Sequence, residues 1–114
     1  MAGIDWRNAG ATVAWVPSAV TTNPTDGTVL CDSGPLDPGL WLFGITGETD
    51  SSIVFDIKAI TLSQLLARRR PAAGDVDWLA PSQIRLPSGE SVRVIIVGNP
   101  SAIVQLTLFG VWLG

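Results

Sequence analysis

The C-terminal stretch Leu86–Gly114 constrains the fold of this chain most, because apolar and polar residues alternate along it as they do in β-strands. Pro87–Gly89 and Gly98–Ser101 are turn signals. Residues 92–97 alternate between these two turns, and a second alternating run starts at Ile103 and continues to the end almost without a charge. We therefore expect two long strands that form a terminal hairpin.

The second half of the final strand, Leu108–Leu113, is apolar on both faces. Such a terminus would leave a large apolar patch in water unless something covers it. Two interpretations stay open. The strand is either a central strand covered by its own domain, or it lines a subunit interface through Phe109, Val111, Trp112 and Leu113.

The composition also indicates association with another protein. The chain has 114 residues, the size of a single domain, and 46% of them are hydrophobic. Only 15% are charged, against about 25% in an average soluble domain. No run approaches the ~20 apolar residues of a membrane-spanning helix. We therefore expect a neighbouring protein, and not a membrane, to cover the apolar excess.

The charge balance argues against nucleic acid as a partner. The formal net charge is −3, whereas a nucleic-acid-binding surface needs a basic excess. The one basic run, Arg68-Arg69-Arg70, is either a solvated loop or helix end, or a docking contact for an acidic partner.

Residues with catalytic chemistry are few, and we expect no enzyme, no cofactor and no metal site. Cys31 is the single cysteine and the chain has no histidine, so the thiol has no imidazole base and is expected to be a buried apolar residue. Zinc-ligand spacing and a glycine-rich phosphate loop are both missing. Asp75 and Asp77 are spaced like two ligands of a calcium loop, but the other ligands are missing. Trp78 beside them could stack on a sugar or could plug the edge of a core.

The rest of the chain predicts further short strands at residues 11–16, 28–32, 40–46, 52–60 and 83–86. Gly47–Asp50 is expected to be a hairpin turn, Thr61–Arg70 a short helix or a loop, and Asp75–Pro81 irregular. About seven or eight short strands with frequent turns indicate an all-β antiparallel β-sandwich of the jelly-roll type.

The N-terminal part is expected to be an irregular arm, residues 1–27, followed by the β-sandwich domain, residues 28–114. The arm carries Trp6 and Trp15, and a disordered tail should lack aromatic residues. We therefore expect the arm to dock on its own sandwich or on a neighbour. The N-terminus has no signal-peptide pattern, which predicts synthesis in a cytoplasm.

Two resemblances add to this interpretation. Leu86–Gly114 resembles the last strands of trimeric jelly rolls of the tumour necrosis factor and complement globular-head type. The matching residues are Leu86, Gly89, Glu90, Val92, Val94 and 109–113. That resemblance implies an apolar final strand at a threefold axis.

The whole chain is also similar to small virion proteins of tailed bacteriophages. Val29–Leu36 with Gly39 matches the opening strand and turn of such proteins. The resemblance implies a homotrimeric cement or decoration protein, made in the bacterial cytoplasm and bound to the major capsid protein on the capsid exterior. Trp6 and Trp15 are then the expected capsid contacts. Some relatives serve in tails or spikes, and the N-terminal part has no counterpart.

Three functions compete at this point. The first is a structural virion protein, in keeping with the apolar excess and the aromatic arm. The second is a binding module, such as a receptor-binding or carbohydrate-binding jelly roll, which needs an exposed aromatic with polar neighbours; Trp78 is the one candidate. The third, an enzyme, is the least supported, because histidine is absent and Cys31 is isolated.

Overall fold

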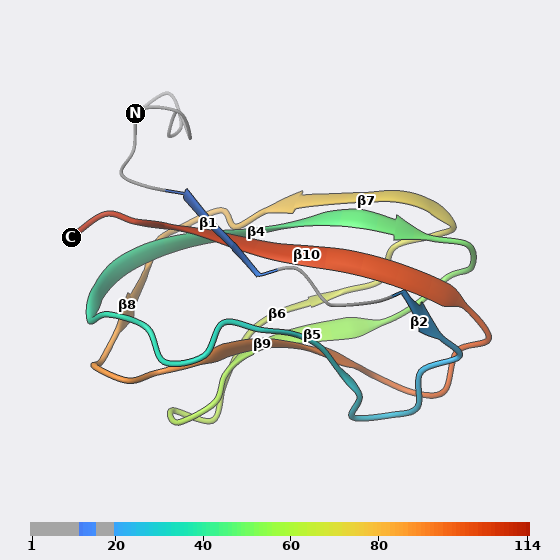
Figure 1. The fold of residues 1–114 in the computed structure, drawn as a ribbon, viewed down its shortest axis with the longest axis horizontal. Helices are drawn as coiled ribbons and strands as arrows, with labels where there is room; N and C mark the ends of the chain where they lie inside the picture. The colour runs from blue at the N-terminus through green and yellow to red at the C-terminus, as the bar shows by residue number, and fades with distance from the viewer. Residues whose placement is uncertain (1–11, 16–19) are drawn as a thin grey trace.

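Strand β10, Ile103–Trp112, is central to the larger of two antiparallel sheets that pack face to face (Figure 1). The computed structural model describes residues 12–15 and 20–114. Sheet A contains β1 (Thr12–Trp15), β2 (Thr21–Thr22), β4 (Gly39–Thr49), β7 (Gly74–Leu79), β8 (Ile84–Leu86) and β10. Sheet B contains β3 (Val29–Asp32), β5 (Phe55–Ala59), β6 (Gln64–Arg69) and β9 (Val92–Ile96). The predicted all-β antiparallel sandwich is confirmed.

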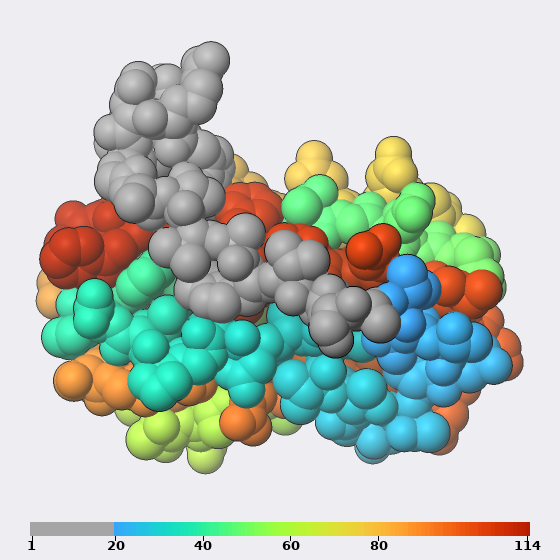
Figure 2. All heavy atoms as spheres, in the orientation of Figure 1, coloured from blue at the N-terminus to red at the C-terminus, as the bar shows by residue number. Residues whose placement is uncertain are grey.

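The order of the strands leaves one side of the sandwich with two free edges. Sheet A runs β1-β10-β4-β7, with β2 also on β10 and β8 also on β4, and sheet B runs β3-β9-β5-β6. Strands β7 and β6 are therefore edge strands. In the space-filling view, residues 20–40, coloured blue to cyan, extend over the side of the molecule that faces the viewer (Figure 2).

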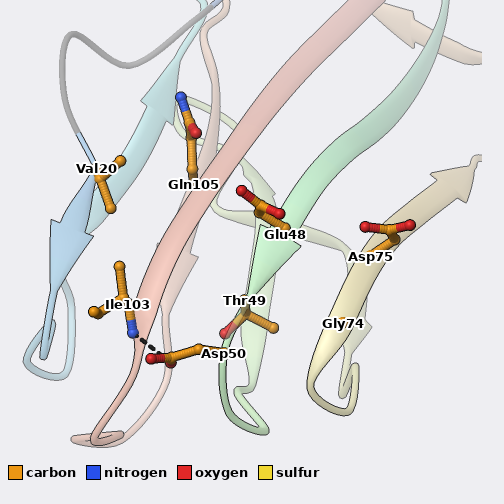
Figure 3. A pocket seen from close by; sticks show the side chains of 8 residues that line it. All are labelled: Val20, Glu48, Thr49, Asp50, Gly74, Asp75, Ile103 and Gln105. Atoms are coloured by element: carbon orange, nitrogen blue, oxygen red, sulfur yellow. Dashed lines mark hydrogen bonds between the residues drawn. The ribbon is translucent and has the colours of Figure 1, made fainter.

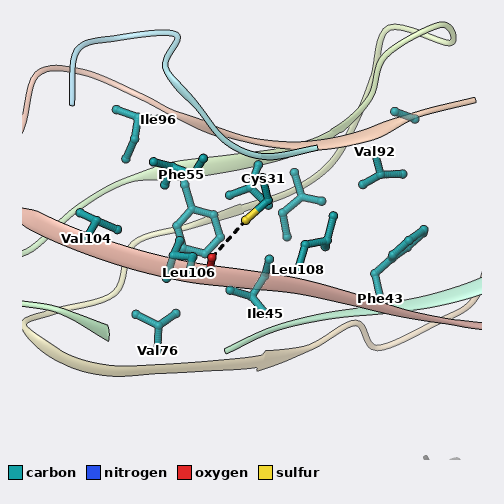
Figure 4. Packing of buried hydrophobic residues seen from close by; sticks show 14 of the residues in the cluster. Cys31, Phe43, Ile45, Phe55, Val76, Val92, Ile96, Val104, Leu106 and Leu108 are labelled. Atoms are coloured by element: carbon teal, nitrogen blue, oxygen red, sulfur yellow. Dashed lines mark hydrogen bonds between the residues drawn. The ribbon is translucent and has the colours of Figure 1, made fainter. Parts of the chain in front are cut away.

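The core lies between the sheets and follows the two-residue period of the strands. The inward residues of β9 and β10 are almost fully buried, and those of β4 and β5 meet them from the two sheets (Figure 4). They include Val92, Val94 and Ile96, with Val104, Leu106 and Leu108, and Phe43, Ile45, Phe55 and Ile57. Burial of each such side chain contributes roughly 1.5–3 kcal/mol.

The predicted terminal hairpin is wrong, because β9 and β10 lie in different sheets. Strand β9 pairs with β3 and β5, whereas β10 pairs with β1, β2 and β4. The Gly98–Ser101 connection therefore crosses from one sheet to the other. It is held at Asp26, whose carboxylate accepts the Gly98 N–H at 2.7 Å and whose own N–H donates to Asn99 Oδ1 at 3.0 Å.

The predicted short helix or loop at Thr61–Arg70 is also wrong, because most of that segment forms the edge strand β6. Strand β6 pairs with β5 through Phe55↔Arg69 and Ile57↔Ala67, with a register shift after Ile57. The leucines at helical spacing do not share a buried face, since Leu62 and Leu65 are 47% and 49% exposed. Pairing with β5 overrides the local helical pattern.

Two further segments differ from expectation. Gly47 and Thr49 continue β4 instead of forming a hairpin turn, because this part of the chain pairs with β10 on one side and with β7 on the other. A Cβ on Gly47 would collide with the carbonyl oxygen of Gln105. Residues 75–79, expected to be irregular, belong to β7, which pairs with β4 through Ile45↔Trp78 and Gly47↔Val76.

The strand expected at residues 11–16 is present as β1, which pairs with β10 of the same chain through Ala14↔Phe109 and Trp15↔Leu108. Part of the predicted arm thus belongs to sheet A. Trp6 lies outside the described residues. Over residues 12–15 and 20–114, the structure contains no helix long and apolar enough to span a membrane.

Candidate functional site

The outer face of sheet A is apolar near the C-terminal end of β10. Phe109 lies over Gly44 of β4, where a Cβ would collide with the ring and would approach the Trp78 carbonyl oxygen to 2.9 Å. Leu79 of β7 pairs with Gly44 on the other side and is 45% exposed. A glycine in the central strand therefore lets the Phe109 ring approach the backbone of the sheet, beside an exposed leucine.

The four residues of the predicted interface have different environments. Phe109 and Leu113 are partly exposed, Trp112 is 44% exposed, and Val111 is fully buried within its own chain. The Trp112 indole N–H donates to the Pro38 carbonyl at 3.1 Å, which fixes the ring at the end of the sheet. Phe109, Trp112 and Leu113 thus remain accessible, and their role as an interface stays a prediction, as does the partner contact of Trp6 and Trp15.

A second feature is a groove between the free edges of β6 and β7. One cavity of about 350 Å³ is lined by Leu66, Ala67 and Ile84, with Arg69 and Trp78. A neighbouring cavity of about 280 Å³ is also lined by Arg69 and Trp78, and additionally by Asp75 and Asp77. Because two residues line both cavities, we treat them as one feature, called the edge groove below.

Trp78 differs from the other tryptophans of residues 20–114. The indole N–H of Trp41 donates to the Asp37 carbonyl at 2.9 Å, and that of Trp112 donates to Pro38. Trp78 makes no side-chain hydrogen bond with any described residue. No buried side-chain nitrogen or oxygen in the described part of the chain lacks a partner, so the N–H of the half-buried Trp78 is accessible to solvent.

The three consecutive arginines lie in different environments because successive side chains of a strand point to opposite faces. Arg68 forms a two-point ion pair with Asp56, with Nε–Oδ1 at 2.6 Å and Nη2–Oδ2 at 2.8 Å. Arg69 lines the edge groove. The hydrogen bonds from Arg68 lower the pKa of the Asp56 carboxyl from its ordinary value, against the opposite effect of burial.

This ion pair covers part of the outward face of β5. Asp56 points outward from β5, yet it is only 3% exposed because Arg68 from the adjacent strand lies against it. Asp56 therefore stabilises the pairing of β5 with the edge strand β6.

A third feature is a pocket of about 350 Å³ at the opposite end of sheet A from Trp112 (Figure 3). Glu48, Asp75 and Gln105 point along its rim, and Val20 and Ile103 supply apolar surface. Asp50 accepts the Ile103 N–H at 2.7 Å and closes the lower end. Residues 12–15 and 20–114 contain no group of three or more acidic, cysteine or histidine side chains arranged to hold a metal ion.

Cys31 is buried in the core, as expected, and its thiol donates to the Leu106 carbonyl at 3.3 Å (Figure 4). Burial raises the pKa of the Cys31 thiol to about 11. The thiol is therefore protonated at neutral pH and is a poor nucleophile.

Sequence reasoning identified Trp78 but not the edge groove. The groove depends on two strands, β6 and β7, that were predicted as a helix or loop and as an irregular segment. The Gly44–Phe109 contact was also missed. An isolated glycine inside an otherwise apolar strand is the signal that could have indicated a close approach there.

Comparisons with known proteins establish the fold but identify neither a family nor a function. No protein-family model matches the sequence, and no curated protein matches it. The globular domain of zebrafish complement 1qA protein is similar in structure, with a TM-score of 0.67 and 8% identity over 90% of this chain and 97% of that one. The CBM36-1 domain of a multidomain xylanase from the hindgut metagenome of Trinervitermes trinervoides has a TM-score of 0.62 and 7% identity over 87% and 96%. The chain is a jelly-roll-like β-sandwich.

Proposed function

We propose that this protein is a non-enzymatic structural subunit of a tailed-bacteriophage virion. In this proposal it is a homotrimeric cement or decoration protein, made in the bacterial cytoplasm and bound to the major capsid protein on the capsid exterior. The observation that carries the association is a set of apolar side chains that stay accessible near the C-terminal end of sheet A: Phe109, Leu79 and Leu113, with Trp112 at the end of the sheet. The phage context comes from the resemblance of residues 29–39 and of the chain as a whole.

The energetics of this surface favour association. Leu79 and Trp112 are 45% and 44% exposed, and covering a large apolar side chain fully contributes roughly 1.5–3 kcal/mol. In a rotationally symmetric oligomer the same surface of every subunit meets around one axis, so each subunit buries its apolar patch against its neighbours. The choice of a trimer over a dimer follows from the resemblance to trimeric jelly rolls.

Light scattering on the purified protein tests the association. The wild type is expected to be a trimer, and Trp112→Asp to be monomeric or aggregated, because an unpaired charge is strongly disfavoured in an apolar contact. Leu65→Asp is the matched control, since Leu65 is 49% exposed on the outer side of sheet B. A monomeric wild type, or a Trp112→Asp protein with the wild-type mass, would remove the interface.

Copy number in purified virions tests the cement role. A cement protein is present at high copy on the capsid, whereas a receptor-binding tip is present at low copy. Quantitative mass spectrometry relative to the major capsid protein therefore separates the two.

A second candidate, a carbohydrate-binding or receptor-binding module of a phage tail or spike, is favoured by one observation. Trp78 is a half-buried aromatic with an available N–H in the edge groove, between polar residues of β6 and β7. Low copy number in virions together with binding to bacterial surface polysaccharide would favour this candidate over the cement role.

A further inference from the structure

The edge groove is formed by the architecture of the sandwich and not by one loop. Strand β7 is the last strand of sheet A and β6 the last of sheet B, so both offer free backbone edges on the same side. Apolar residues of the core are only partly covered there, namely Leu66, Ala67, Trp78 and Ile84. The larger cavity, about 350 Å³, falls within the ~300–1,000 Å³ range of small-ligand sites.

Trp78 gives the groove an amphipathic anchor. Its neighbour in the same inward row, Val76, is 5% exposed, whereas Trp78 is only half buried. An aromatic ring offers a flat face to apolar C–H groups, and its N–H can donate to an oxygen at the ring edge. A ligand that presents both a C–H face and oxygen atoms would use both parts of this side chain.

The polar groups around Trp78 carry both charges. Arg69 forms no ion pair with any described residue and lines both cavities. Asp75 and Asp77 line the smaller cavity from the outward side of β7, and their side chains likewise have no ion-pair or hydrogen-bond partner among the described residues. A guanidinium only donates hydrogen bonds and a carboxylate only accepts them, whereas a hydroxyl group does both.

This mixture selects a ligand class. A polyanion would be repelled by Asp75 and Asp77, and a cation by Arg69 and Arg70, while a purely apolar ligand would leave these groups without partners. We infer that the edge groove binds a neutral glycan, with a sugar ring stacked on Trp78 and its hydroxyls bonded to Arg69. This inference rests on the carbohydrate-binding candidate above and assigns its site and ligand class; it does not depend on the oligomeric state.

The experiment uses the full-length protein and isothermal titration with neutral hexasaccharides of glucose, xylose and N-acetylglucosamine. At least one is expected to bind, and Trp78→Ala should weaken that binding at least tenfold. Arg69→Ala, which removes a donor without disturbing a described contact, should weaken it about tenfold as well. Leu65→Ala is the matched control and should bind like the wild type, because Leu65 is 49% exposed on the outer side of sheet B, away from the groove.

Trp78 also packs on the core, so thermal unfolding of each variant is measured in parallel. If Trp78→Ala fails to fold, Arg69→Ala decides the result. Binding to a hexasaccharide that neither variant weakens would overturn the groove as the site and leave the carbohydrate-binding candidate standing. No binding to any of the hexasaccharides would overturn both. Binding of a charged oligosaccharide in preference to its neutral counterpart would overturn the ligand class.

Discussion

The carboxylate of Glu90 accepts the backbone N–H of Thr61 at 2.7 Å, across the end of the β5–β9 pair. The same carboxylate accepts the N–H groups of Leu62 and Ser91, each at 2.8 Å, and Glu90 is 1% exposed. Burial alone would raise the pKa of Glu90, but these backbone hydrogen bonds outweigh it and hold the pKa below its ordinary value of 4.5. One buried carboxylate thus fixes the β5–β6 turn, in which Ser63 has a φ of 51°.

Glu90→Gln is therefore expected to destabilise the protein at neutral pH and to reduce its sensitivity to acid. Because the folded pKa lies below 4.5, the ionised carboxylate contributes its full stability above that value and loses it as pH falls through the folded pKa. The free energy of unfolding should fall by about 1–3 kcal/mol at pH 7, since the amide cannot satisfy all three donors.

Urea denaturation of wild type and variant between about pH 7 and pH 3 measures this, and the difference between them should shrink in acid. Glu48→Gln, at an exposed position on β4, is the control. A difference that stays constant over the whole range would show that the Glu90 charge does not act through these hydrogen bonds.

Gly44→Ala is expected to destabilise the sandwich, because the new Cβ would collide with the Phe109 ring and lie 2.9 Å from the Trp78 carbonyl. Overpacking of this kind typically costs about 1–3 kcal/mol. Thermal unfolding measures the loss.

The double variant Gly44→Ala/Phe109→Ala separates the two contacts. Removing the Phe109 ring should recover part of the stability that Gly44→Ala loses. The stability that is not recovered reports the contact with the β7 backbone. Simple additivity of the two single variants would contradict the geometry, since residues in direct contact should couple.

The fold class could be predicted from the sequence because strand alternation is a local signal. Val92, Val94 and Ile96 fall on one face whether their strand pairs with the next strand or faces it across the core. For that reason the alternation predicted β9 and β10 correctly, but not the crossing between sheets at Gly98–Ser101. Pairing across a sandwich is a long-range property that this local pattern does not encode.

The candidate site was less predictable for the same reason. The spacing of Leu62, Leu65 and Leu66 is consistent with a helix, and only the hydrogen bonds from β5 make the segment a strand. Without β6 and β7 as edges, the edge groove could not be anticipated, although Trp78 was singled out. Glu90 was noted for its place in a motif, and its partners, Thr61 and Leu62, are distant in sequence.

Arg68→Ala is expected to lower the unfolding temperature more than Arg69→Ala. The first change leaves the nearly buried Asp56 carboxylate without its ion-pair partner, whereas Arg69 has no ion pair with a described residue. Differential scanning calorimetry on the two variants measures the contrast. Equal unfolding temperatures would show that the Arg68–Asp56 pair does not stabilise the β5–β6 edge.

The same arginines are not expected to bind nucleic acid, because they face different environments and the chain is acidic overall. A gel-shift titration with duplex DNA at low and high salt should show no binding by the wild type. Salt-sensitive binding that a triple Arg→Ala variant at positions 68–70 abolishes would contradict this.

Removal of residues 1–16 is expected to leave the sandwich folded but to weaken its attachment to phage particles. Strand β1 adds backbone hydrogen bonds along β10 from Leu108 to Val111, while the core residues lie between β4, β5, β9 and β10. The truncated chain should keep its β-rich circular dichroism and unfold at a lower temperature, and the exposed edge of β10 should make it more prone to aggregate.

A full-length chain with Trp6→Ala and Trp15→Ala is the matched comparison, because alanine keeps the backbone that β1 uses for pairing. If the aromatic side chains bind the capsid, this variant should decorate particles as poorly as the truncated chain while unfolding at nearly the wild-type temperature. Decoration at the wild-type level by both proteins would remove the capsid contact of the arm. Decoration lost only on truncation would assign the effect to strand β1 and not to the tryptophans.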